Sequence, residues 1–104
     1  MRYRKRNNSV VIDGRVQIDD LGLLGSSGVI FKLPADYVPA RSKYLAAMRF
    51  NSTPGREVGA CSIVVNGLEH PNPANVGNVA IIPVYGDSLT GSDVYYLQLQ
   101  IPLD

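Results

Sequence analysis

The chain has 104 residues, 45% of them hydrophobic, and its 10 Lys and Arg against 9 Asp and Glu give a formal net charge of +1. This length suits one domain and is too short for two, and the hydrophobic content excludes a disordered chain. The near-neutral charge excludes a global electrostatic attraction to nucleic acid or to a membrane surface. We therefore expect a single domain over residues 1–104.

The cysteine content and the apolar runs narrow the class of protein further. Cys61 is the only cysteine, so a disulfide-framed secreted module is excluded. The start MRYRKRNNS lacks the apolar segment of a signal peptide, and no stretch approaches the ~20 apolar residues that span a bilayer. We expect a soluble domain without membrane insertion.

The first predicted element is a strand that carries a short basic cluster: Arg2, Arg4, Lys5 and Arg6. Such a cluster can bind phosphate, which leaves nucleic-acid binding as an alternative. We interpret the cluster instead as an exposed strand with solvated alternate positions, and we expect no nucleic-acid partner.

Two dipeptides predict tight hairpin turns. Asp13-Gly14 lies between the apolar runs Val10–Ile12 and Val16–Ile18, and Asn66-Gly67 follows a third run. Both dipeptides suit a two-residue turn with positive φ at its centre. We predict a hairpin at each, with the second return strand beginning at Leu68.

Four further runs predict strands: Val29–Leu33, Tyr44–Asn51, Val79–Val84 and Tyr95–Ile101. Tyr44–Asn51 contains good helix formers, but its short length and the turn residues around it favour a strand. The last run alternates strictly, which places an apolar face against a core and an amide-rich face toward solvent or a partner. About seven short strands predict an all-β fold, either an antiparallel β-sandwich or a jelly-roll-like barrel.

The stretch from Leu33 to Pro39 predicts a structural corner. Pro34 cannot donate a ladder hydrogen bond, so the preceding strand ends there or lies at an edge. Pro39 fixes a second bend, and Tyr37 is expected to fold its ring over the end of the sheet. The strand before the corner should present Val29, Phe31 and Leu33 on one face and Ile30 and Lys32 on the other.

The pattern Leu-Pro-x-x-Tyr-x-Pro at residues 33–39 resembles the signature of head domains in bacteriophage tail proteins, including lactococcal-type receptor-binding heads and baseplate modules. Asp36 stands where that family usually has glycine. Tyr3-Arg4-Lys5, the segment Ser62–Gly67 and the closing strand Val94–Ile101 are similar, in order, to further family elements. The chain ends without the family's usual Leu-x-Gly-Ile-Ser-Phe.

The resemblance implies a homotrimeric head at the distal end of the virion tail, which adheres to saccharide on the host cell surface. Other tail or baseplate proteins would be its partners. Two alternatives stay open: a structural baseplate or tail-fibre module without a ligand, and a hydrolase of cell-wall polysaccharide. Binding residues vary among family members, so none is carried over to this chain.

The residue inventory offers little for catalysis or metal binding. Cys61 and His70 would have to meet to form a nucleophilic pair, but Cys61 belongs to an apolar alternation and is expected in the core. Glu57, Asp87 and Asp93 would form a glycosidase pair only if the fold brought two of them together. No spacing fits a zinc or calcium site. We predict no enzymatic activity, no metal and no cofactor.

Candidate saccharide-binding residues lie on two loops. Amides, carboxylates and aromatic rings are the groups that hold sugars, and Pro71 and Pro73 stiffen the first loop, which lowers the entropy lost on binding. The proposed ligand-binding residues are Glu69, His70, Asn72, Asn75, Tyr85 and Asp87. The alternative is that they are ordinary polar loop residues.

Overall fold

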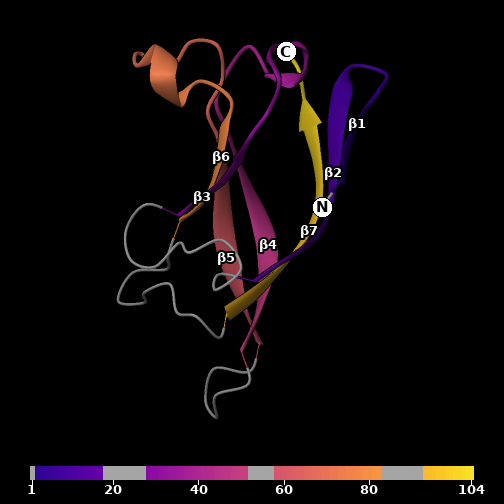
Figure 1. Cartoon of the computed structure of the whole chain (residues 1–104). Helices are drawn as coiled ribbons and strands as arrows, with labels where there is room; N and C mark the ends of the chain where they lie inside the picture. The colour runs from indigo at the N-terminus through magenta and orange to yellow at the C-terminus, as the bar shows by residue number, and fades with distance from the viewer. Residues whose placement is uncertain (1, 18–27, 52–57, 83–92) are drawn as a thin grey trace.

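The computed structural model describes residues 2–17, 28–51, 58–82 and 93–104 (Figure 1). Within these ranges the chain forms seven strands: β1 (Arg2–Arg6), β2 (Ser9–Gln17), β3 (Val29–Lys32), β4 (Lys43–Asn51), β5 (Val58–Val65), β6 (Asn78–Ile82) and β7 (Asp93–Pro102). Two 3-10 turns, η1 (Ala35–Tyr37) and η2 (Pro73–Asn75), lie in connections. None of the described segments is a helix long and apolar enough to cross a membrane.

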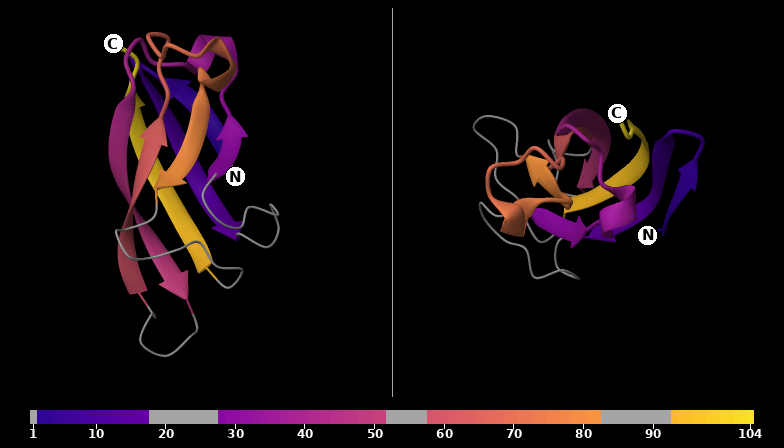
Figure 2. Two further views of the ribbon diagram at one scale, coloured as in Figure 1. Left: turned by 90° about the vertical axis from the view of Figure 1, so that its left-hand side faces the viewer. Right: turned by 90° about the horizontal axis from the view of Figure 1, so that it is seen from above.

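All seven strands belong to one antiparallel sheet in the order β1-β2-β7-β4-β5-β6-β3. Strand β7 lies between β2 and β4, so it joins the β1–β2 hairpin to the other four strands. The sheet curls into a half-barrel (Figure 2). The predicted all-β antiparallel architecture is confirmed, with one curled sheet.

The alternation predicted for the last strand is confirmed. Tyr95, Leu97, Leu99 and Ile101 are at most 3% exposed, whereas the residues between them point outward. Inward side chains of β2, β3, β4, β5 and β6 complete the core. Burial of each large aliphatic side chain stabilises the fold by roughly 1.5–3 kcal/mol.

The run that contains helix formers is a strand, as predicted. Leu45 and Ala47 of β4 turn inward and pack in or against the core. Tyr44, Met48 and Phe50 lie on the opposite face and are exposed. The outer face of β4 therefore carries apolar side chains that no other described segment covers.

The hairpin predicted at Asp13-Gly14 is wrong. Strand β2 runs straight through these residues and pairs with β1 on one side and with β7 on the other. The turn lies instead at Asn7-Asn8, where Asn7 has a φ of 55°. The ladder hydrogen bonds to both neighbours outweigh the local turn preference of Asp-Gly.

The return strand predicted at Leu68 is also wrong. Strands β5 and β6 do pair, with Val65 opposite Val79, but residues 66–77 form a long connection between them. The Leu68 amide donates to the Pro39 carbonyl at 2.9 Å, which ties this connection to the corner. Gly67 is needed for this approach, because an added Cβ would overlap the backbone of Arg41 and Ser42.

The corner at residues 33–39 begins where it was predicted to begin, after the end of the preceding strand. Strand β3 stops at Lys32, before Pro34, and both Leu33 and Pro39 are buried. The Leu33 amide donates to the Gly77 carbonyl at 2.9 Å. Tyr37 packs against the core, as a ring over the end of the sheet should.

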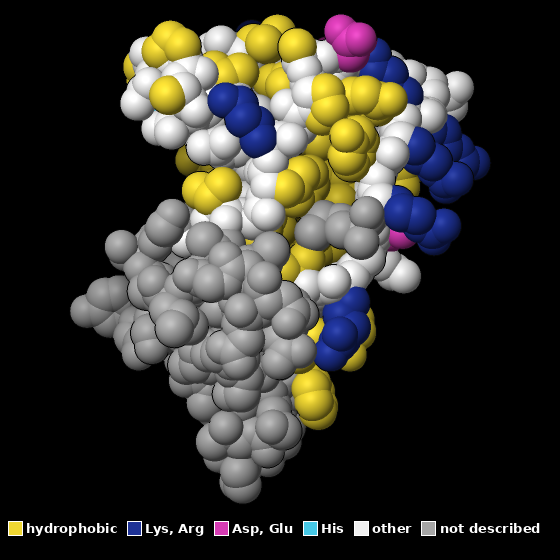
Figure 3. Space-filling model, viewed as in Figure 1, with side chains coloured by type: hydrophobic (Ala, Val, Ile, Leu, Met, Phe, Trp, Pro, Cys, Tyr) yellow, Lys and Arg dark blue, Asp and Glu magenta, His cyan; other side chains and the backbone are white. Residues whose placement is uncertain are grey.

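Aromatic rings link the two edge strands of the curled sheet. Tyr3 of β1 stacks on Phe31 of β3 with 6.3 Å between the ring centroids, and it meets Tyr37 edge-on at 5.1 Å. The Lys5 ammonium lies 5.3 Å from the centre of the Tyr37 ring. We call the meeting of these edges the seam; hydrophobic side chains show between its two sides in Figure 3, with Lys and Arg along the side of β1.

The face assignment predicted within β3 is wrong at Ile30. Ile30 is 7% exposed and belongs to the core, while Val29 and Phe31 are half-buried. The pairing with β6 shifts register between Val29 and Phe31. Such a bulge breaks the two-residue alternation on which the assignment depended.

We expect Gly67→Ala to destabilise the chain by about 2 kcal/mol or more, because the added methyl group would force the 66–77 connection away from the corner. The exposed loop variant Ala74→Gly should change the free energy of unfolding by less than about 1 kcal/mol. Chemical denaturation of both variants measures the difference. Equal stability of Gly67→Ala and wild type would contradict this packing.

Candidate functional site

Four of the predicted saccharide ligands lie together in the 66–77 connection, and all four make internal hydrogen bonds. Glu69 Oε1 accepts from the Ser42 amide at 2.6 Å, and His70 Nδ1 accepts from the Asn72 amide at 3.1 Å. Asn72 Oδ1 caps η2 by accepting from the Ala74 amide at 3.0 Å. These contacts shape the loop.

Asn75 is the fourth predicted ligand in this connection, and the other two predicted ligands lie elsewhere in the chain. Asn75 Oδ1 accepts from Asn78 Nδ2 at 3.4 Å, and its carbonyl accepts from Asn66 Nδ2 at 3.1 Å. Tyr85 and Asp87 lie outside the described residues. The structure therefore places the four predicted residues of the first loop close together. Their role in ligand binding stays a prediction.

The Glu69 carboxylate is held in its charged form. The hydrogen bond from the Ser42 backbone is the largest cause that lowers its pKa below the usual 4.5, followed by the Ser42 side chain. Desolvation raises the pKa by less than these two hydrogen bonds lower it, and the coulombic interactions with His70 and Arg41 lower it further. Ser42 Oγ in turn accepts from the Gly67 amide at 3.0 Å, so this carboxylate fastens the connection to the start of β4.

The residues considered for catalysis do not form a described site. Cys61 is buried in the core, as expected. Glu57 and Asp87 fall outside the described ranges, as does the side chain of Asp93. Among the described residues, no group of three or more His, Cys, Asp or Glu side chains is placed to hold a metal ion.

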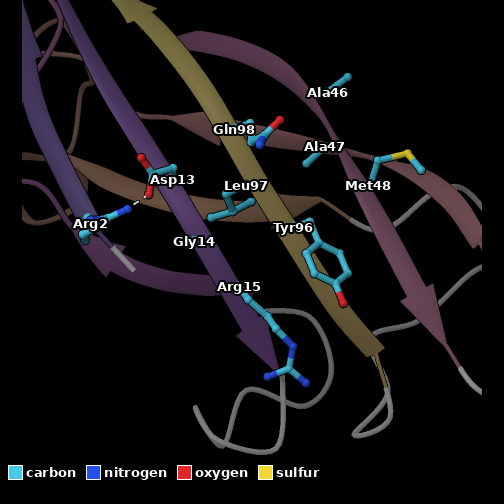
Figure 4. A pocket seen from close by; sticks show the side chains of 10 residues that line it. All are labelled: Arg2, Asp13, Gly14, Arg15, Ala46, Ala47, Met48, Tyr96, Leu97 and Gln98. Carbon is cyan, nitrogen blue, oxygen red and sulfur yellow. Dashed lines mark ion pairs between the residues drawn. The ribbon is translucent and has the colours of Figure 1, made fainter.

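An open groove of about 780 Å³ crosses the outer face of β2, β7 and β4 (Figure 4). Tyr96 is 48% exposed in this groove. It pairs in register with Arg15 on one side and with Met48 on the other. The groove thus places an aromatic ring between a guanidinium group and a thioether.

A polar row lies next to the Tyr96 row. Asp13 pairs in register with Arg2 of β1 and with Gln98 of β7, and all three line the groove. Arg2 Nε and Asp13 Oδ1 are 3.4 Å apart, with the side chains 86% and 39% exposed. An ion pair this exposed is worth at most about 1 kcal/mol, so a ligand can compete for either partner.

Sequence reasoning found only part of the groove. The alternation of Tyr95–Ile101 predicts that Tyr96 and Gln98 face solvent or a partner, as the structure shows. The Asp13-Gly14 pattern instead predicts a turn, and no motif marks Arg15. The signal that places both on the outer face is the spacing of Val10, Ile12 and Val16, because Asp13 and Arg15 lie at the alternate positions of the strand.

The chain matches no family model, no curated protein and no solved structure. The interpretation of the groove therefore depends on its residues and geometry.

We expect Glu69→Gln to lower the midpoint of thermal unfolding at pH 7, because a neutral amide accepts more weakly from the Ser42 amide. A carboxylate whose pKa is lowered by folding stabilises the folded state at pH values above its unfolded pKa. This stabilisation is lost as the pH falls through its folded pKa. The difference between wild type and variant should therefore shrink as the pH falls below about 4.5. A difference that is unchanged from pH 7 to pH 3 would contradict the role of the charge.

Proposed function

We propose that this chain is a non-catalytic module that binds saccharide in the groove across β2, β7 and β4. The observation that supports this most is the exposed ring of Tyr96, flanked by Arg15 in register and by the Arg2, Asp13 and Gln98 row. An aromatic ring covers the C–H face of a sugar, while amide, carboxylate and guanidinium groups bond its hydroxyls.

The position of these side chains favours binding without large rearrangement. Tyr96 and Gln98 lie on β7, which is paired on both sides, and their neighbours Tyr95, Leu97 and Leu99 are buried. Side chains on a packed strand lose less entropy on binding than side chains on a loose loop. An open groove also suits a segment of a polymer better than a small enclosed molecule.

We propose further that the module acts at the distal end of a phage tail as a homotrimer that adheres to the host cell surface. The Leu33–Pro39 corner supports this through its resemblance to tail head domains. Tyr44 and Phe50, 74% and 43% exposed on β4 outside the groove lining, offer an apolar surface for sister subunits. Several linked sites would multiply a weak saccharide affinity.

The same apolar surface favours a second candidate function, a structural baseplate or tail-fibre module that makes protein contacts without a saccharide ligand. Binding of polysaccharide by the isolated chain separates the two. Light scattering tests the homotrimer: a trimer supports it, and a monomer contradicts it.

We expect Tyr96→Ala to weaken binding to a panel of immobilised bacterial polysaccharides by about tenfold or more, because central aromatic residues of a binding site contribute most of its energy. Leu68→Ala removes an exposed apolar side chain that lies outside both the groove and the apolar surface of β4. It is the control, so it should leave the affinity within about twofold. Biolayer interferometry measures both. Equal losses in the two variants, or no binding by wild type, would contradict the proposed site.

A further inference from the structure

Positive charge is concentrated on one part of the outer face. Arg2, Arg4 and Arg6 alternate along β1, and their register with β2 places them on the same face as Asp13 and Arg15. Asp13 is the single acidic side chain described on this face of β1 and β2. The whole chain is nearly balanced, with 10 basic and 9 acidic residues, so the excess is local.

Arg15 lies at the end of this positive surface that meets the Tyr96 ring. The two residues are register partners on neighbouring strands, which places their Cβ atoms about 4.5–5.5 Å apart. Figure 4 shows their side chains next to one another in the groove. A group attached to a sugar that stacks on Tyr96 is therefore within reach of the Arg15 guanidinium.

We infer that the saccharide is anionic: its ring stacks on Tyr96, and a carboxylate or phosphate on that ring or on the next one pairs with Arg15. This inference rests on the proposed function. The planar guanidinium group binds either oxyanion with two parallel hydrogen bonds, a geometry that neutral hydroxyls do not match. Arg4 and Arg6 extend the favourable potential along β1 for a longer polyanion.

A nucleic acid is the less favoured polyanion. Its phosphates are closely spaced along the whole strand, so they would lie along the groove beside Asp13, whose carboxylate offers a phosphate no hydrogen-bond donor. In contrast, a carboxylate is a good acceptor for sugar hydroxyls. Binding of duplex DNA is therefore an outcome that the test must be able to reveal.

The test compares acidic bacterial polysaccharides with their own carboxyl-reduced forms, and phosphate-bearing polysaccharides with their dephosphorylated forms. Each pair shares its sugar rings and differs in charge. We expect the native member of at least one pair to bind about tenfold more tightly, with the advantage shrinking at high salt. The pair that shows the difference identifies the anionic group as carboxylate or phosphate.

Two variants locate the effect. Arg15→Gln should remove most of the preference for the native polysaccharide, measured as the ratio of the affinities for the native and the neutral form. Lys32→Gln also removes one positive charge, but Lys32 lies on β3, where its ammonium donates to the Ala74 carbonyl. This control should keep the preference.

The outcomes separate this inference from the proposed function. Equal, Tyr96-dependent binding of native and neutral forms would overturn the anionic ligand and leave saccharide binding in place. No binding of either form would overturn both. Binding of duplex DNA as tight as that of the polysaccharide, and abolished by Arg15→Gln, would also overturn the inference, in favour of a nucleic-acid ligand.

Discussion

A single sheet has two faces, and this chain buries one of them by curling the sheet on itself. Strand β7 shows the division most clearly, because Leu97 and Leu99 are buried in the core while Gln98 between them is exposed. The curl brings the edge strands β1 and β3 together at a seam where aromatic rings, rather than a backbone ladder, make the contact. The concave side holds the buried apolar side chains that stabilise the fold, and among the described residues the convex side carries the exposed polar and aromatic ones.

The separation of a buried concave face from an exposed convex face explains why the polar residues of the 66–77 connection and those of the groove have different roles. In the 66–77 connection, Glu69 and its neighbours bond to the backbone of Ser42 and of the loop itself, so they hold the end of the half-barrel together. In the groove, Tyr96 and Arg15 project from paired strands without being needed for the core. Polar and aromatic groups can be placed there with little cost to folding, and the strands beneath hold them in fixed positions.

How much could be predicted depends on how local each interaction is. The inward and outward faces of β7, the strand character of β4 and the end of β3 before Pro34 all follow from short-range alternation and proline chemistry. The turn prediction at Asp13-Gly14 is wrong because these residues pair with β7, more than 80 residues away along the chain. No local sequence pattern indicates that pairing. At position 67 glycine is required because the backbone of Arg41 lies too close for a Cβ atom, and not because the chain makes a tight turn there. The groove is built from β2, β7 and β4, so its residues could not be grouped before the strand order was known.

We propose that the outward side chains of β2 and β7, and not the 66–77 connection, bind the saccharide. NMR can separate these two surfaces by mapping the amide chemical-shift changes that follow addition of an acidic oligosaccharide. We expect changes concentrated at residues 13–15 and 96–98. Changes confined to residues 69–75, with the groove amides unmoved, would contradict this proposal.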